Sequence, residues 1–268
     1  MVDDGYEWLN VVADYHLDLF NNKRKTLSQA ITTHHTLRRA GRHDEADHLT
    51  LDYIVGSVAM KGFYAALLNE WLPLVCNSQN LKTRADALGW TGRLLSDTGN
   101  YEIALTYLKQ SLTISQQISD KVGESTSLNN MADAYRMQGN YETALTYLKQ
   151  SLTISQQIGD KDGEGAALNN ISTIYWAQSN YDAALIYMKQ SLVFCQQTSN
   201  KEGEGTILNN ISSIYWIQGD IKTALMYLKQ ALSISRQIGD KDSESMNLNN
   251  LSQLYHAQGD DDLSLIHI

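Results

Sequence analysis

The sequence repeats itself every 40 residues, from about residue 84 to near its end. The clearest marker is a pair of asparagines that returns at the same step, as Asn129-Asn130, Asn169-Asn170, Asn209-Asn210 and Asn249-Asn250. A fixed period of this length is typical of a solenoid, in which each unit buries its apolar face against its neighbours. The period therefore constrains function as well as fold, because solenoids mostly serve as binding surfaces.

Each repeating unit has the pattern of two helices joined by a tight turn. In the unit that begins near residue 123, apolar or small side chains at i, i+3, i+4 and i+7 mark one face of a first helix: Leu128, Met131, Ala132 and Tyr135. Gly139 follows and suits the left-handed cap that ends a helix. A second helix is expected over Tyr141 to Ile158, and the polar turn at 159–163 provides carboxylates that cap the next helix. No segment alternates with a period of two, which excludes a propeller blade of similar length.

These units resemble the tetratricopeptide repeat, in its longer form of about 40 residues. The matching positions are Met131, Ala132, Tyr135, Gly139, Tyr141, Ala144 and Ser151 in the second unit, Ile171, Ser172, Tyr175, Tyr181, Ala184 and Ser191 in the third, and Ile211, Ser212, Tyr215, Gly219, Ile221, Ala224 and Ala231 in the fourth. We expect the small residues Ala132, Ser172 and Ser212 to lie where two helices cross closely. The sequence departs from the family pattern at Ser179, which replaces the turn glycine, and at Ile221, which replaces tyrosine.

The resemblance implies an all-α fold, an α-solenoid that winds as a right-handed superhelix. Its units would lie near 84–123, 124–163, 164–203 and 204–243, with an incomplete unit over 244–262. Residues 1–83 are expected to form four or so irregular helices, with apolar faces supplied by Trp8, Phe20, Leu37, Ile54, Phe63 and Trp71. This region resembles the divergent helical start of repeat arrays in signal-transduction ATPases with numerous domains, including bacterial ones.

In tetratricopeptide arrays the first helices of successive units line a concave groove. The resemblance places there a ladder of asparagines, a second row one turn further along, and a third row at the next exposed step. These predicted groove residues are Asn130, Asn170, Asn210 and Asn250, then Asp133, Thr173, Ser213 and Gln253, then Arg136, Trp176, Trp216 and His256. An amide has both donors and an acceptor, so the ladder could hold the backbone of an extended peptide. Alternatives stay open for both groups of residues. The asparagines either bond between adjacent helices or persist from duplication, and the tryptophans pack in the core.

Composition excludes several functions. The net charge of −9 argues against nucleic acid and acidic membrane surfaces as partners. The two cysteines form neither a disulfide framework nor a metal-binding pattern. No apolar run is long enough to cross a membrane, and the start of the chain is not a signal peptide, so we expect a cytoplasmic protein. The histidines at 34, 35, 43 and 48 lack metal-ligand spacing and are expected at solvated helix ends.

No convergent catalytic set is visible, so we expect no enzymatic activity, no metal and no cofactor. The function predicted from the sequence is a protein–protein interaction module that binds a peptide or a partner segment in its groove. The alternative is a sensor or regulatory part of a larger signalling enzyme, either a multidomain ATPase or a caspase-like protease.

The fifth unit lacks a second helix to cover it, which predicts self-association there. Residues 263–268 match the translation of a transposon-end adapter, and we expect them to be a non-native tail.

Overall fold

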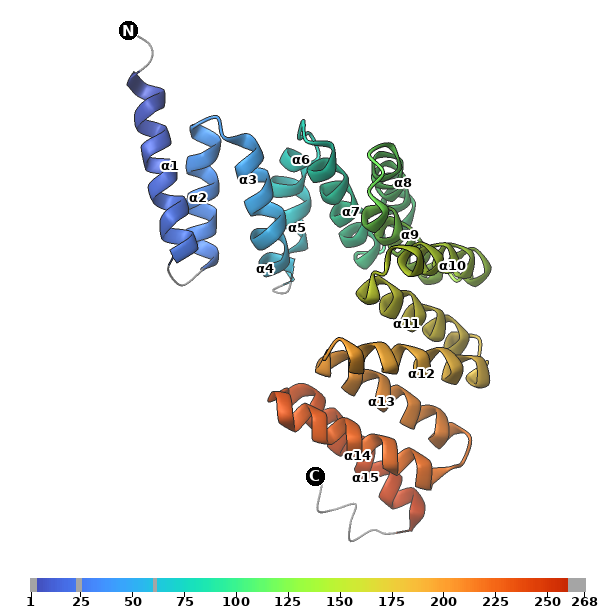
Figure 1. The fold of residues 1–268 in the computed structure, drawn as a ribbon. Helices are drawn as coiled ribbons and strands as arrows, with labels where there is room; N and C mark the ends of the chain where they lie inside the picture. Colours follow the sequence, from blue (N-terminus) through green and yellow to red (C-terminus); the bar gives the residue numbers. More distant parts are fainter. Residues whose placement is uncertain (1–3, 23–25, 60–61, 260–268) are drawn as a thin grey trace. The chain divides into compact units, whose positions relative to one another are not determined.

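The computed structural model describes residues 4–22, 26–59 and 62–259, and every regular element within these ranges is a helix (Figure 1). The all-α prediction is therefore confirmed for the described residues. Two units are compact in themselves, residues 1–144 and residues 145–268, and each is described separately. The expected tail at 263–268 lies outside the described residues. No helix in the described ranges has the length and apolar character needed to cross a membrane.

The first unit begins with four irregular helical segments, the number that the sequence predicts. They are α1 (Asp4–Asn22), α2 (Leu27–Arg39), the continuous run α3 (His43–Leu49), η1 (Thr50–Val55) and α4 (Gly56–Ala59), and the continuous run α5 (Tyr64–Ala66), η2 (Leu67–Trp71) and α6 (Leu72–Val75). The stretches η1 and η2 are π-helical turns that interrupt the α-helical hydrogen bonding. Gly41 and Gly62 lie in the turns with φ of 76° and 74°, where a residue without a Cβ is least strained.

One apolar core holds these irregular helices together. Phe20, Leu37 and Ile54 are buried in it, as the sequence predicts, and Trp71 packs at its edge. The prediction for Phe63 is wrong: its side chain is 60% exposed, because it lies before the first turn of α5 instead of on a helix face. The side chain of Trp8 lies outside the described residues.

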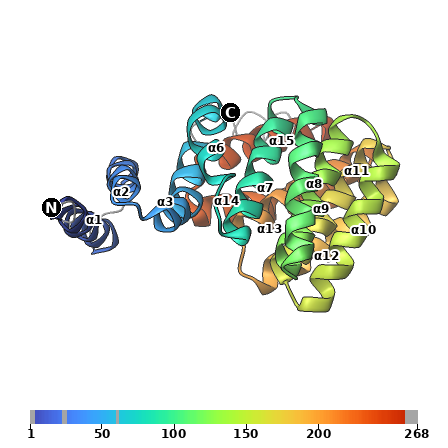
Figure 2. The ribbon, with the colours of Figure 1, turned by 90° about the horizontal axis from the view of Figure 1, so that it is seen from above.

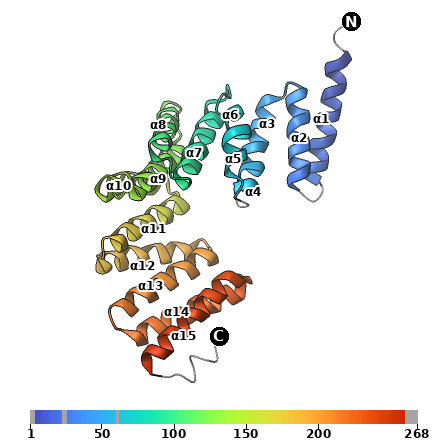
Figure 3. The ribbon, with the colours of Figure 1, turned by 180° about the vertical axis from the view of Figure 1, so that it is seen from behind.

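The regular repeats begin in the same unit with α7 (Leu81–Asp97), α8 (Tyr101–Gln117) and α9 (Lys121–Met137), which pack against one another (Figure 2). Helix α10 (Tyr141–Ile158) has the predicted bounds and contains the division between the two units. The second unit continues with helices that stack in chain order (Figure 3): α11 (Lys161–Ala177), α12 (Tyr181–Gln197), α13 (Lys201–Ile217), α14 (Ile221–Ile238) and α15 (Lys241–Gln258). Stacked helix pairs of this kind are the predicted α-solenoid architecture.

The first and second helix of a repeat cross closely where the sequence places small residues. Ala132, Ser172 and Ser212 are all buried. The hydroxyl of Ser212 donates to the backbone carbonyl of Ala224 at 2.8 Å, which joins α13 to α14 at the crossing. At the same position of the first repeat stands Gly92, where a Cβ atom would lie 2.5 Å from Cγ of Leu108. The prediction of close crossings is confirmed.

A polar contact closes each junction between one repeat and the next. The carboxylate of Glu164 accepts from Nε2 of Gln156 at 3.2 Å and from Nζ of Lys161 at 3.0 Å. The equivalent carboxylates 40 residues before and after make the same two kinds of contact, at Glu124 with Gln116 and Lys121 and at Glu204 with Gln196 and Lys201. This contact was not predicted from the sequence, although the glutamates recur with the period of the repeat.

Candidate binding site between successive repeats

One cavity of the second unit lies between α11, α12 and α13. It has a volume of about 620 Å³. Gly165 and Ala166 on α11 and Gly203 on α13 leave this space open, because larger side chains there would fill it. Phe194 and Cys195 of α12 contribute to the lining. We call this cavity the α11–α13 pocket.

The same place in the next repeat holds a much smaller cavity. The pocket between α13, α14 and α15 has a volume of about 150 Å³, and we call it the α13–α15 pocket. Most of its lining residues stand 40 positions after those of the α11–α13 pocket, and several of them are bulkier. Thr206 stands in place of Ala166, and Met246 in place of Thr206. Side-chain volume at a few positions therefore decides whether a junction is open.

The first unit has the corresponding cavity between α7, α8 and α9, with a volume of about 330 Å³. We call it the α7–α9 pocket. Lys82 lines it and forms ion pairs with Asp86 at 2.8 Å and with Asp120 at 2.7 Å. These hydrogen bonds raise the pKa of Lys82 although burial of its side chain opposes the charge. This pocket therefore contains an ammonium group that belongs to the chain itself.

The four asparagines of the predicted ladder lie in different surroundings. Asn130 lines the α7–α9 pocket, Asn210 lines the α13–α15 pocket, and Asn170 is half-buried on α11. Nδ2 of Asn250 instead donates to Oδ1 of Asn209 at 3.1 Å, a bond between α15 and α13. For this residue the structure has the inter-helix bond that the sequence analysis left open as an alternative.

The preceding asparagine of each pair, which the sequence analysis did not select, also matters. Asn169 lines the α11–α13 pocket and Asn209 lines the α13–α15 pocket. Among the described residues, neither Asn169 nor Asn210 has a side-chain hydrogen-bond partner. The wider α11–α13 pocket thus leaves the amide of Asn169 available, whereas the equivalent Asn209 in the narrower α13–α15 pocket is bonded to Asn250.

The second predicted row makes contacts within its own helices. Asp133 pairs with Arg136, a member of the third row, at 2.6 Å. The hydroxyls of Thr173 and Ser213 each donate to the carbonyl four residues earlier at 3.1 Å. None of these four residues lines the three pockets described above. Gln253 of this row is exposed on α15.

The two predicted tryptophan anchors differ in exposure. Trp176 is half-buried, packs against an apolar cluster that contains Ile211, and meets the ring of Tyr181 edge-on at 5.9 Å. Trp216 is 37% exposed at the end of α13. His256 of the same row is exposed on α15. The structure therefore favours Trp216 over Trp176 as a residue that a partner could reach.

The thiol in the α11–α13 pocket has no feature that would activate it as a nucleophile. Burial raises the pKa of Cys195, and the nearby carboxylates of Glu204 and Asp162 raise it further. A thiol with a raised pKa stays protonated and is a poor nucleophile. Within the described residues, no group of three or more His, Cys, Asp or Glu side chains is arranged to hold a metal ion.

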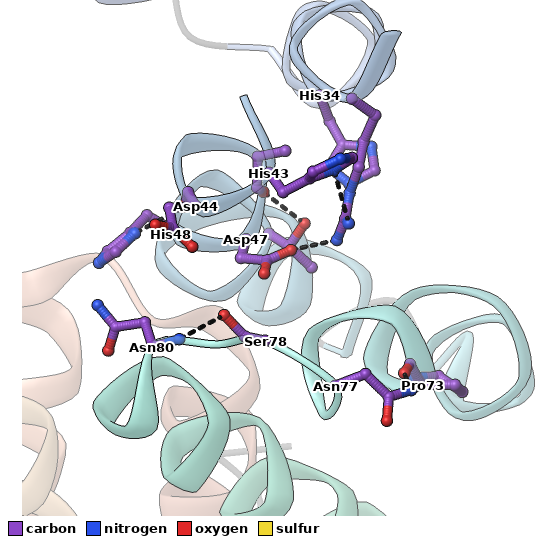
Figure 4. Close-up of polar contacts among 12 residues, drawn as sticks. His34, His43, Asp44, Asp47, His48, Pro73, Asn77, Ser78 and Asn80 are labelled. Atoms are coloured by element: carbon purple, nitrogen blue, oxygen red, sulfur yellow. Dashed lines mark hydrogen bonds and ion pairs between the residues drawn. The ribbon is translucent and has the colours of Figure 1, made fainter. Parts of the chain in front are cut away.

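The prediction of solvated histidines near the start of the chain is right for His35, His43 and His48, which are exposed, and wrong for His34. His34 and Asp47 are each 2% exposed (Figure 4). Arg38 forms an ion pair with Asp47, and its Nε donates to Nε2 of His34 at 3.5 Å. The ring of His34 lies 4.8 Å from that of Trp71, so packing of α2 against η2 removes this histidine from water. The spacing along the sequence could not reveal this, because Trp71 comes from a distant segment.

Solved structures with the same arrangement of helices come from several kinds of protein. They include BtubC (BKLC) from P. vanneervenii, with a TM-score of 0.66 and 17% identity over 81% of this chain and 88% of that one. A Rap protein complexed with competence and sporulation factor matches with a TM-score of 0.64 and 14% identity, over 98% of this chain and 74% of that one. At these identities the likeness concerns the fold.

A third similar structure is a signal transduction ATPase with numerous domains from Pyrococcus horikoshii, which has a tetratricopeptide repeat sensor. Its TM-score is 0.65 at 16% identity, over 98% of this chain and 46% of that one. No curated protein matches this sequence. The sequence pattern of the tetratricopeptide repeat matches residues 83–157, 123–197 and 203–267, which is more than half of the chain. This chain therefore belongs to the tetratricopeptide repeat family.

Proposed function

We propose that this chain is a non-catalytic interaction module that binds a peptide or an extended segment of a partner protein. The observation that carries the proposal is the α11–α13 pocket of about 620 Å³, with the free amide of Asn169 in its lining. Pockets of this size are common for bound ligands. An amide can both donate to and accept from a peptide backbone.

The arrangement of the pocket supports an extended ligand. Its walls are the first turns of two parallel helices, α11 and α13, and the last turns of α12 complete the lining. The lining combines apolar side chains such as Phe194 and Ile207 with polar ones such as Asn169, which is the mixture that fixes the orientation of a ligand. The Rap protein, whose fold is similar, is complexed with competence and sporulation factor. This likeness agrees with a ligand-binding role for the repeats.

The test is to close the pocket with a substitution that the fold already accepts elsewhere. Thr206→Met introduces at the α11–α13 pocket the residue that stands at 246 in the narrow pocket. Peptides are selected on the full chain from a phage-displayed library of random 12-residue sequences. We expect Thr206→Met to weaken the binding of selected peptides by about tenfold or more, because the side chain occupies the space that they need.

Thr126→Met is the matched control, since Thr126 occupies the equivalent position in the α7–α9 pocket. We expect it to leave the affinity within about twofold, and both variants to keep the helicity and melting temperature of the parent chain. Failure to select any peptide, or equal losses in the two variants, would contradict the proposal.

A second candidate is a sensor arm of a larger signalling enzyme. The observation that favours it is the likeness to the ATPase from Pyrococcus horikoshii, of which this chain spans 46% and which has a tetratricopeptide repeat sensor. In this reading the same pocket would receive the signal. Sequencing the source DNA through both ends of the reading frame tests it, with a nucleotide-binding or protease region expected. The self-association expected at the last repeat stays a prediction, which light scattering of the full chain would check.

A further inference from the structure

We infer that the α11–α13 pocket selects a partner segment that presents an arginine or lysine side chain. This inference rests on the proposed function, and it names the chemistry of the partner. It is carried by three features of the pocket: its uncompensated negative charge, a cation already placed over its aromatic ring, and the way in which the corresponding pocket of the first unit is filled.

The pocket has more negative than positive charge available to a ligand. Asp162 and Glu202 both belong to its lining, and neither forms an ion pair with another described residue. The basic residue of the lining, Lys161, is already paired with Glu164 at 3.0 Å. The neighbouring Lys201 is paired in the same way with Glu204 at 2.6 Å. Two carboxylates at the first turns of α11 and α13 therefore face the pocket without a counter-charge.

The lining of the pocket also suits a cation. The ammonium group of Lys161 lies 5.1 Å from the centre of the Phe194 ring, a distance at which the ring attracts a positive charge. The amide oxygen of Asn169 is available to accept a hydrogen bond from a guanidinium or ammonium group. An arginine side chain could thus contact apolar surface with its stem while its head meets carboxylates.

The corresponding pocket of the first unit holds an ammonium group of the chain itself, bound by acids whose equivalents in the α11–α13 pocket are Ala166 and Asn200. Position 82 in the α7–α9 pocket corresponds to position 162, and it holds a lysine where the α11–α13 pocket has an aspartate. The ammonium of Lys82 is bound by Asp86 and Asp120. In the α11–α13 pocket the acids Asp162 and Glu202 stand at the positions of Lys82 and Val122, and the ammonium of Lys161 is already paired with Glu164. The difference points to a cation from outside the chain.

Acidic residues in the first turn of a helix also interact favourably with the helix dipole. That role would account for a small effect of Asp162 and Glu202 on stability, but it would not make binding depend on the charge of a peptide. The experiment therefore has to measure selectivity between peptides as well as stability.

The probes are three fluorescein-labelled peptides of about twelve residues, in which alanine alternates with arginine, glutamine or glutamate. Their binding to the full chain is measured by fluorescence anisotropy in about 0.15 M salt, where charges separated by more than about 8 Å are largely screened. The variant is Asp162→Asn with Glu202→Gln. The matched control is Asp182→Asn with Asp220→Asn, which also removes two negative charges, and asparagine at 220 still caps α14. Asp182 lies in the first turn of α12, the end opposite to the turns that line the pocket.

We expect the arginine peptide to bind the parent chain most tightly, and the pocket variant to weaken that binding by about tenfold while the control changes it by less than about twofold. Equal losses in variant and control would mean unspecific attraction to an acidic protein and would overturn the inference. Tighter binding of the glutamine or glutamate peptide, abolished by Thr206→Met, would also overturn it while leaving the proposed function intact. If Thr206→Met does not change the binding of any peptide, that result would contradict both the inference and the proposed function.

Discussion

The irregular helices α1–α6 and the regular helices α11–α15 are held together by different kinds of contact. In the regular helices the same contact recurs at each junction: the ammonium of Lys189 lies 5.7 Å from the centre of the Tyr215 ring, and Lys229 lies 5.4 Å from that of Tyr255. In the described part of α1–α6, the polar contacts around Arg38 occur once. There a single ion pair with the buried Asp47 joins α2 to α3.

The two regions are therefore sensitive to different kinds of substitution. In the repeats many equivalent contacts contribute to the free energy of unfolding, and each contributes little because it is partly exposed to water. A contact that occurs once, with buried charged groups, concentrates the effect in a few atoms.

Arg38→Met should be the most damaging of the substitutions considered. It leaves the carboxylate of Asp47, which is 2% exposed, without its cation. Burial already raises the pKa of Asp47, and loss of the guanidinium should raise it further. Removing one partner of such a pair costs roughly 3 kcal/mol. Hydrogen-exchange protection of α2 and α3 at neutral pH measures the loss.

Lys161→Met is the matched change in the repeats. The Lys161 side chain is 56% exposed and Glu164 keeps its bond from Gln156, so the expected loss is below about 1 kcal/mol. Similar losses in the two variants would mean that the two regions do not differ in the way described.

Acid should weaken α1–α6 through His34. Burial, followed by the charge of Arg38 and of His35, lowers the pKa of His34 from 6.5 to about 4. The unfolded chain therefore takes up a proton below pH 6.5 that the folded chain refuses until about pH 4. This contribution to stability is complete above pH 6.5 and is lost as the pH falls toward 4, by up to about 3 kcal/mol.

The measurement compares the parent chain with His34→Gln, because other groups titrate in the same range. Hydrogen-exchange protection of α2, corrected for intrinsic exchange rates, should fall more steeply between pH 7 and pH 5 in the parent chain than in the variant. Protection in α13, which has no histidine, should show little of this dependence. Parallel curves for parent and variant would show that His34 does not control the response.

Ser179→Gly should stabilise the repeats by a smaller amount. Ser179 has a φ of 57° in the turn between α11 and α12, where most repeats have glycine. A residue with a Cβ is strained in this left-handed conformation by roughly 1 kcal/mol, and glycine removes the strain.

The reciprocal change Gly219→Ser, at a φ of 81°, should lose a similar amount. Thermal unfolding of the two variants and the parent checks both signs. A loss of stability in Ser179→Gly would show that the serine makes a compensating contact.

Much of the fold could be predicted from the sequence because it depends on short-range patterns. The bounds of α10 were predicted to the residue, since its apolar period and flanking turns are local signals. The last helix begins at Lys241, before the predicted start of the incomplete fifth unit at 244, because Asp240 caps it through the backbone amides of Asp242 and Ser243.

The candidate site was less predictable. The ladder positions recur with the repeat, so the sequence identifies the face on which they lie. Whether Asn250 bonds to Asn209, and whether Asn169 stays free, depends on the width of each junction. That width depends on side chains from three helices, such as Ala166, Phe194 and Thr206, whose combined volume no local pattern describes.

The repeating helices, the turns between them and the family to which the chain belongs can be read from the sequence alone, because period, caps and small residues act over a few positions. Which junction is open and how His34 is buried depend on tertiary packing. These properties arise from residues far apart in the chain that meet in space, and packing fills or leaves volume according to all of them together.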